Sequence, residues 1–263
     1  MRIICPVKRV PDTAAEKQIN SADNTVDRDA SEPVLNANDE WSIEEAMRIK
    51  ERTEGTEVIA LCMGPDSAQT TVRKALSYGL DGAIQVTDDA LAGSDAVATA
   101  RVLAKALEDE EFDLIIMGNQ SSDARTMLVP AMLAEFLDLP ALTYAKRLEL
   151  DEGKAIADRE TPTGHQTVEA PLPAVVSVVE AINEPRYPSF KGIMAAKSKP
   201  LHTKSLADIG VDASEVGHDG SWTKVVEITP RPPKEAGEKV EDDGSGQVGA
   251  QAIADFLAAQ KLI

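Results

Sequence analysis

Strand-like and helix-like patterns alternate along the first half of the chain. Short continuous apolar runs, which are typical of strands buried on both faces, lie at residues 3–7, 58–63, 83–86 and 114–117. Apolar residues recur at helical spacing between them, at residues 42–52, 66–77 and 94–107, and again between Gly118 and residue 137. Strands that alternate with helices predict an α/β fold with a doubly wound, mostly parallel, Rossmann-like sheet.

The pattern changes after Pro140. Four further strand-like segments, joined by polar turns, follow at residues 142–150, 155–160, 166–170 and 174–182. We expect these segments to complete or extend the sheet.

From Ala207 onward the chain becomes polar and loses its core periodicity. Residues 230–233, Pro-Arg-Pro-Pro, favour a stiff, extended backbone, and an amphipathic helix is predicted over residues 251–262. We therefore predict an α/β nucleotide-binding domain at residues 1–206 and an extended C-terminal arm at residues 207–263. The pattern leaves open whether this arm packs on its own domain or on a partner subunit.

The chain is strongly acidic, with a formal net charge of −18. Such a surface repels nucleic-acid phosphates and anionic lipid, which argues against both as partners. No stretch reaches the roughly 18 apolar residues of a membrane span, and the first residues lack the apolar region of a secretory signal. We therefore expect a cytoplasmic protein without direct membrane insertion.

Residue spacings typical of catalytic and metal centres do not stand out. Cys5 and Cys62 lie in strand-like runs, where buried thiols are expected. None of the three histidines has metal-ligand spacing with a second histidine or a cysteine. No nucleophile and base stand at a hydrolytic spacing. We predict no metal site, no catalytic residue, and a carrier rather than an enzyme.

One polar loop has the features of an anion-binding turn. Gly118 follows the fourth strand and allows the backbone to turn sharply. Ser122, Asp123 or Thr126 could cap the following helix. The free N–H groups at that helix start, together with Arg125, would attract a phosphate. Loops at the carboxyl ends of strands hold ligands in open α/β sheets, although an ordinary capped turn has the same sequence.

Three other segments, at residues 7–10, 36–40 and 63–65, could form the remaining walls of one crevice. Each follows a strand or precedes a helix. Each also has an ordinary structural interpretation, as solvated cations, a helix cap or a turn. The chain has neither G-x-G-x-x-G nor a phosphate-loop motif, so a standard dinucleotide or P-loop site is not predicted.

The stretch 183–199 combines backbone stiffeners, apolar residues and cations outside any core pattern. No acidic residue occurs within 187–206, whereas lysines stand at positions 191, 197, 199 and 204. A basic island on an acidic protein suggests a docking surface for an acidic partner. Phe190 would supply an aromatic anchor there, unless its ring packs into its own domain.

This stretch, which begins Asn183-Glu184-Pro185-Arg186-Tyr187, closely resembles the signature of the electron transfer flavoprotein β subunit family. In that signature an N-E-P-R-[YF] turn leads into a partner-recognition loop ending in I-M-x-A-K, which is Ile-Met-Ala-Ala-Lys here. The resemblance covers nearly the whole chain, with further matches at residues 7–12, 36–50 and 118–140.

The resemblance implies an adenine-nucleotide-hydrolase-like sheet and a heterodimer with an α subunit. That subunit would hold most of the redox FAD, and the C-terminal arm would pack on it. In such a complex, electrons arrive from dehydrogenases, usually acyl-CoA dehydrogenases, and leave to a membrane quinone oxidoreductase.

The resemblance also implies which residues bind a nucleotide. In family members the four segments enclose AMP in a structural role, or a second FAD in electron-bifurcating members. The matching positions are Pro6, Val7, Lys8, Asn36, Ala37, Asn38, Asp39, Met63, Gly118, Asn119, Gln120, Ser121, Ser122, Asp123, Ala124, Arg125, Thr126 and Pro130. The loop departs from the D-D-x-x-N-Q-T-G of many AMP-binding relatives, which leaves the nucleotide open. On balance we favour AMP and a non-bifurcating protein.

A second set of positions concerns partner recognition: Glu160, Arg186, Tyr187, Phe190, Lys191, Ile193, Met194 and Lys197. Relatives commonly have leucine where Phe190 stands, so the anchoring character is kept. Glu160 aligns with a glutamate that contacts the mobile flavin domain of the α subunit.

Two other classes of protein remain as alternatives. A universal-stress-type nucleotide-binding module would lack the added strands and the long tail. An adenine-nucleotide-binding enzyme would need a loop such as S-G-G-x-D-S, which this sequence does not contain.

Overall fold

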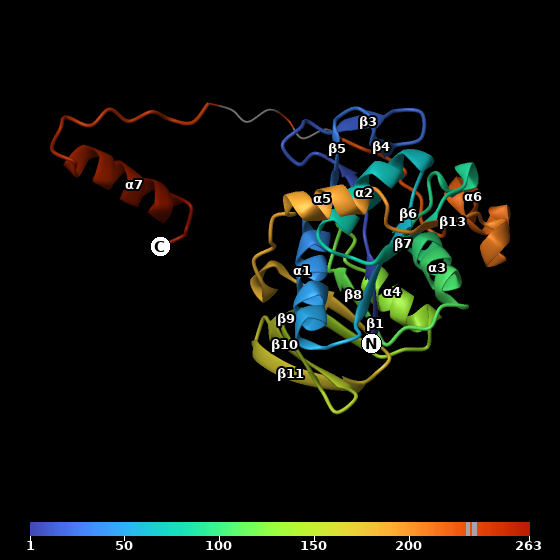
Figure 1. Cartoon of the computed structure of the whole chain (residues 1–263). Coiled ribbons are helices and arrows are strands. Elements are labelled where there is room, and N and C mark those ends of the chain that lie inside the picture. The colour runs from blue at the N-terminus through green and yellow to red at the C-terminus, as the bar shows by residue number, and fades with distance from the viewer. Residues whose placement is uncertain (230–231, 233–235) are drawn as a thin grey trace. The chain divides into compact units, whose positions relative to one another are not determined.

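A single large sheet organises the first part of the molecule. The computed structural model describes residues 1–229, 232 and 236–263, which divide into two units, Met1–Val226 and Glu227–Ile263. Within the described residues, nine strands form this sheet (Figure 1). In sheet order they are β11 Gly164–Pro171, β10 Lys154–Thr161, β9 Ala141–Asp151, β12 Ala174–Val178, β8 Leu114–Gly118, β1 Arg2–Pro6, β6 Glu57–Met63, β7 Gly82–Val86 and β13 Leu201–Lys204.

Most neighbouring strands in this sheet are parallel. Every pair from β9 across to β13 is parallel, whereas β9, β10 and β11 pair antiparallel at one edge. The predicted mostly parallel sheet with added strands is therefore confirmed.

Helices cover both faces of the sheet. In the first unit they are α1 Ala37–Arg52, α2 Gln69–Ser77, α3 Ala96–Leu107, α4 Val129–Phe136, α5 Phe190–Ala196 and α6 Gly217–Gly220. α1, α2 and α5 contribute to a core on one face, and α3 and α4 to a core on the other (Figure 1). Because strand side chains alternate, Ile3 and Cys5 enter the first core and Ile4 the second. Burial on both faces explains the continuous apolar runs of the strands.

Shorter elements connect the main ones. Two small antiparallel pairs are β2 Arg9–Pro11 with β5 Pro33–Leu35, and β3 Gln18–Asn20 with β4 Thr25–Asp27. Single 3₁₀ turns stand at Asp66–Ala68, Asp89–Leu91, Glu180–Ile182, Ala207–Ile209 and Ala213–Glu215. The sequence pattern predicts none of the strands β2 to β5, because three residues are too few to show a periodicity. The turn at 180–182 also ends β12 four residues before the predicted end at Ile182.

α1 begins five residues earlier than the prediction. Its first residue is Ala37 rather than Ser42, and Asn36 is its N-cap residue. Asn38 and Asp39 are buried in the first turn. Their side chains are tied to neighbouring loops, and these contacts override the weak helix preference of asparagine and aspartate.

α4 begins later than the prediction. Its N-cap residue is Leu128, without a side-chain cap, and Pro130 lies in the first turn. The predicted caps at 122, 123 and 126 are therefore wrong. Residues 119–128 form an irregular loop in which Arg125 and Met127 have φ of 51° and 57°. The loop consequently does not present the helix-start phosphate site that the sequence suggested.

Residues 207–226 belong to the first unit. Ile209, Val211 and Val216 are buried in the core on the α3 side. The Asp95 carboxylate, which caps α3, also accepts hydrogen bonds from the backbone N–H of Trp222 at 2.9 Å. The first unit thus ends twenty residues beyond the predicted boundary at residue 206.

The second unit contains the helix α7 Gln247–Ala259. None of its side chains is buried. Of the predicted stiff proline run, Pro230, Arg231 and Pro233 lie outside the described residues. None of the described helices is both long enough and apolar enough to cross a membrane.

Candidate nucleotide-binding crevice

The strand order reverses beside β1, and we call the place where the loops after β1 and β8 meet the candidate crevice. The chain leaves β1 through α1 to reach β6 on one side, continues to β7, and later enters β8 on the other side of β1. The connections that follow β1 and β8 therefore diverge above the carboxyl ends of these strands. In open α/β sheets, ligands bind at such a reversal of strand order.

Asn36 connects the loops that follow these two strands. Its backbone N–H donates to the Lys8 carbonyl oxygen at 3.0 Å. Its side-chain Nδ2 donates to the Gln120 carbonyl oxygen at 3.0 Å, and its Oδ1 accepts from the Ser122 N–H at 3.0 Å. One buried amide thus fixes both walls of the crevice.

Asp39 completes this connection. Its carboxylate accepts from the Lys8 backbone N–H at 2.7 Å and from Asn36 Nδ2 at 2.8 Å. Burial raises the pKa of Asp39 to about 7, against the opposing effect of these hydrogen bonds. Burial thus favours the neutral form of this carboxyl group, which would reduce its repulsion of an anionic ligand.

The start of α1 packs directly against the end of β8. A Cβ atom on Gly118 would lie 2.8 Å from both the carbonyl carbon and the oxygen of Asn38. Asn38 Nδ2 donates to Asn119 Oδ1 at 2.8 Å. Only glycine allows this approach, so the predicted glycine requirement has a steric cause beyond the sharp turn.

Two cations meet one buried acid within the crevice. Lys8 Nζ lies 2.9 Å from Asp123 Oδ1, and Arg28 Nε lies 2.8 Å from Asp123 Oδ2. Burial raises the pKa of Asp123, but Lys8 and Arg28 outweigh it and hold the pKa well below its usual range. The site therefore contains a fixed cluster of two positive charges around one carboxylate. Arg28 directly follows β4, and no motif around it distinguishes it from a solvated residue.

Two polar side-chain atoms in the loop after β8 lack a protein partner. Gln120 Oε1 and Ser122 Oγ are buried and make no hydrogen bond. Orphaned buried polar atoms are costly unless a ligand or water satisfies them. The amino, hydroxyl and phosphate groups of a nucleotide would supply suitable partners, so these residues fit such a ligand.

The remaining predicted nucleotide positions are distributed around this core. Pro6, Val7, Gly118 and Asn119 are buried at the strand ends, and Met63 at the end of β6 is half-buried. Residues 124–126 and Ala37 are exposed. Ser121 is half-buried, and its Oγ lies 3.3 Å from Lys8 Nζ.

The segment 183–199 presents apolar side chains to solvent. Tyr187 is 96% exposed and Phe190 80% exposed, and Ile193 and Met194 are about half exposed. Residues 190–196 form α5, whose N-cap Ser189 accepts from the Gly192 N–H at 3.0 Å. The alternative that Phe190 packs inside its own domain is not supported.

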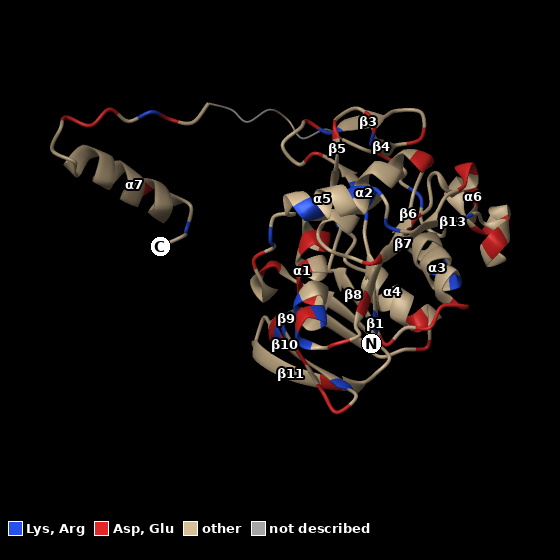
Figure 2. Cartoon of the chain, viewed as in Figure 1, with Lys and Arg blue, Asp and Glu red and all other residues tan. Residues whose placement is uncertain are grey.

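The basic residues of this segment divide into two groups. Lys191 and Lys197 are exposed. In Figure 2, α5 carries a basic (blue) stretch, whereas the region around α6 is acidic (red). Lys199 Nζ instead donates to the Leu80 carbonyl oxygen, and Lys204 Nζ lies 3.0 Å from Glu110. The predicted basic island therefore reduces to two outward lysines.

The two other predicted recognition residues are already paired within the chain. The Arg186 guanidinium faces inward and forms ion pairs with Glu44 and Glu51 of α1. Glu160 is exposed on β10, 2.7 Å from Lys146 Nζ.

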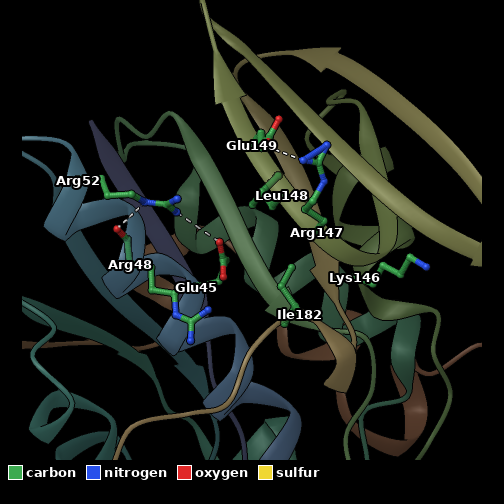
Figure 3. A pocket seen from close by; sticks show the side chains of 8 residues that line it. All are labelled: Glu45, Arg48, Arg52, Lys146, Arg147, Leu148, Glu149 and Ile182. Atoms are coloured by element: carbon green, nitrogen blue, oxygen red, sulfur yellow. Dashed lines mark hydrogen bonds and ion pairs between the residues drawn. The ribbon is translucent and has the colours of Figure 1, made fainter.

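A separate hollow of about 220 Å³ lies between α1 and β9. Figure 3 shows its lining, which includes Arg48, Arg52 and Arg147. Arg52 lies 3.6 Å from Glu45, and Arg147 lies 2.5 Å from Glu149. Each of these arginines pairs with a different acid, whereas Lys8 and Arg28 share Asp123, so this hollow is a weaker anion site than the crevice. Among the described residues no cluster of metal ligands occurs.

Known proteins with similar sequences cover the whole chain. The family profile of the electron transfer flavoprotein domain matches residues 23–209. The electron transfer flavoprotein subunit beta of Mycobacterium bovis is 46% identical over 266 aligned residues, covering 99% of both chains. Its counterpart from Thermoanaerobacterium thermosaccharolyticum is 37% identical over 239 residues, covering 90% of this chain and 91% of the relative.

A further relative carries a different name. The caffeyl-CoA reductase-Etf complex subunit CarD of Acetobacterium woodii is 33% identical over 254 residues, covering 96% of this chain and 97% of the relative. These full-length similarities set aside the stand-alone nucleotide-binding module and the nucleotide-dependent enzyme. The chain therefore belongs to the electron transfer flavoprotein family, as a homologue of its β subunits, which are electron carriers rather than enzymes.

Proposed function

We propose that this chain pairs with an electron transfer flavoprotein α subunit and carries electrons through an FAD shared with that subunit. Acyl-CoA dehydrogenases would supply the electrons, and a membrane quinone oxidoreductase would accept them. The observation that carries this proposal is the exposed aromatic segment around Phe190, in a chain related over its full length to β subunits. The flavin supplies the redox chemistry, and this chain supplies positioning and recognition.

We propose AMP as the nucleotide of the crevice, in a structural role. Asn36, Asp39 and Gly118 would shape its walls, and Gln120 and Ser122 would offer their unpaired polar atoms. Lys8 and Arg28 meet at one point, an arrangement better suited to a single phosphate than to an extended pyrophosphate. A second FAD, as in an electron-bifurcating complex, is the alternative.

The exposed segment would dock the electron-transfer partner. Phe190 and Tyr187 have the exposure and size of interface anchors. Lys191 and Lys197 would attract an acidic partner toward an otherwise acidic protein. Glu160 would contact the flavin-carrying part of the α subunit, once its ion pair with Lys146 is exchanged.

Reversing Lys191 and Lys197 to glutamate should slow association with the donor about tenfold at low salt, because exposed charges steer encounter. The difference should shrink at high salt, since the Debye length falls to about 3 Å at 1 M. The measurement is stopped-flow reduction of the flavin in the co-expressed heterodimer by a reduced acyl-CoA dehydrogenase, across ionic strengths.

The matched control reverses Lys105 of α3 and Lys154 of β10, whose side chains are 40% and 50% exposed. It changes net charge equally and should leave the rate nearly unchanged. A defect of Lys191 and Lys197 that is independent of salt would contradict steering. If no acyl-CoA dehydrogenase reduces the wild-type complex, the proposed donor class is wrong.

A further inference from the structure

Hydrogen bonds and ion pairs hold the first residues of the exposed segment 183–199 against α1. We call this set of contacts the first fastening of the segment. Arg186 Nε donates to Glu44 Oε2 at 2.6 Å, and its NH2 group donates to Glu44 Oε1 at 3.1 Å. The Arg186 backbone N–H also donates to Glu44 at 3.2 Å, and Glu51 binds the outer side of the same guanidinium. Nearby, Asn183 Nδ2 donates to the Trp41 carbonyl oxygen at 3.0 Å. This is a fork-like, charge-assisted arrangement, the kind that fixes geometry most strongly.

Glu44 is the centre of this fastening. Its side chain is only 5% exposed, and its second partner is Arg48, at 2.9 Å on the same helix. Burial raises the pKa of Glu44, but the hydrogen bonds from Arg186 and Arg48 outweigh it and leave the pKa below its ordinary value. The carboxylate is therefore charged at neutral pH and fully engaged.

A second fastening stands at the other end of the segment. Arg73 of α2 donates through NH1 to the carbonyl oxygens of Ala196 at 2.9 Å and Lys199 at 2.7 Å. These carbonyls lie at the end of α5 and just beyond it, where oxygens lack helical partners. Ala196 itself is buried.

Between the two fastenings, α5 rests on the end of α2. A Cβ atom on Gly192 would overlap the Ser77 carbonyl oxygen, so the short helix touches α2 through its glycine. The opposite side of the segment carries the exposed Tyr187, Phe190 and Met194. A seven-residue helix has little stability of its own, so its orientation depends on these contacts.

We propose that Glu44 and Arg73 are positioning residues for partner docking: they hold the two ends of the segment so that Tyr187, Phe190 and Met194 face the partner in one arrangement. This inference rests on the proposed docking function of the segment. It also assigns Arg186 to the internal fastening rather than to direct partner contact. Neither Glu44 nor Arg73 touches the partner in this account.

The expected effect on partner affinity follows from the fraction of molecules in which the segment has its docking arrangement. If loss of one fastening leaves the segment in its docking arrangement about a tenth of the time, the apparent Kd for the partner rises about tenfold. The chemistry of the bound complex is unchanged, because the same arrangement forms once docked. The signature is therefore a raised KM for the flavoprotein with an unaltered kcat.

The experiment uses the heterodimer with Glu44→Gln and, separately, with Arg73→Met. The steady-state KM and kcat are measured with an acyl-CoA dehydrogenase as electron donor, and amide hydrogen exchange is measured over residues 186–198. We expect KM to rise about tenfold, kcat to stay within about twofold, and exchange in this segment to quicken, while flavin content is retained. Arg73→Lys keeps a donor beside the carbonyls and should recover part of the loss.

The matched control is Glu110→Gln. Glu110 also bridges two cations, Arg2 and Lys204, and is 19% exposed, but it follows α3, which packs on the other face of the sheet from α1, α2 and α5. It should change neither KM nor exchange at residues 186–198.

Different failures have different meanings. Unchanged exchange and unchanged KM in both variants, with Phe190→Ala still impairing transfer, would overturn the positioning roles alone. Faster amide exchange without any change in KM would also overturn the positioning roles of Glu44 and Arg73. If Phe190→Ala also leaves transfer intact, the docking function itself is wrong.

Discussion

Replacing Phe190 with alanine should weaken binding of the electron donor at least about thirtyfold, while flavin content and folding stability stay nearly unchanged. The ring is 80% exposed, so its truncation leaves no cavity in the core. Anchors of this type typically contribute 2 kcal/mol or more at an interface, which corresponds to about thirtyfold in affinity. Steady-state transfer from an acyl-CoA dehydrogenase to the heterodimer, together with thermal unfolding, measures both quantities.

Phe136→Ala is a suitable comparison, because Phe136 is also partly exposed but stands on α4, on the other face of the sheet. It should leave donor affinity unchanged. A buried aromatic ring would instead cost about 3–5 kcal/mol of folding stability on truncation. A large fall in melting temperature with normal electron transfer would show that the Phe190 ring is structural.

Gly118→Ala should loosen the crevice and release its nucleotide. The added Cβ would stand 2.8 Å from backbone atoms of Asn38, so the start of α1 must move away from β8. Overpacking of this kind typically costs about 1–3 kcal/mol, or roughly 2–4 °C in melting temperature per kcal/mol for a unit of this size. Because Asn36 and Asp39 move with α1, both crevice walls lose their connection.

The check is nucleotide content per heterodimer and thermal unfolding, beside Gly237→Ala. A Cβ at Gly237 meets no atom within 4 Å, so this control should behave as the wild type. Gly118→Ala with full nucleotide content and an unchanged melting temperature would contradict the packing argument.

The sequence was sufficient to predict eight of the nine strands of the described sheet, all except β13, and to indicate which loops meet beside β1. Continuous apolar runs identify strands buried on both faces, and parallel strands bring their carboxyl ends to one edge. The loops after β1 and β8 were therefore expected to meet near Lys8 and Asn119, and the structure places them together.

The details of the crevice depended on contacts that local patterns do not encode. Asp123 has the chemistry of a helix cap, but in the fold it binds Lys8 and Arg28, which are 115 and 95 residues away. Asp39, in the segment 36–40 that could equally have been an ordinary helix cap, instead accepts hydrogen bonds from Lys8 and Asn36. Hydrogen bonds to residues distant in the sequence thus took the place of the local helix-capping bonds that these residue types favour.

The same limit applies to the exposed segment. Its composition predicted a docking surface, and the exposure of Phe190 agrees with that interpretation. Arg186 has the chemistry of an interface residue, yet its partners are Glu44 and Glu51, more than a hundred residues earlier. Nothing around Arg73 or Glu44 in the sequence distinguishes them from ordinary charged helix positions.

The most direct test of this account is the nucleotide content of the purified heterodimer. Denaturing the complex and separating the released nucleotides by chromatography should yield one FAD and one AMP per pair of subunits. That result would support a single redox flavin with a structural nucleotide in the crevice beside β1. Two FAD and no AMP would instead identify an electron-bifurcating complex, and a single FAD with no other adenine nucleotide would contradict the crevice as a nucleotide site.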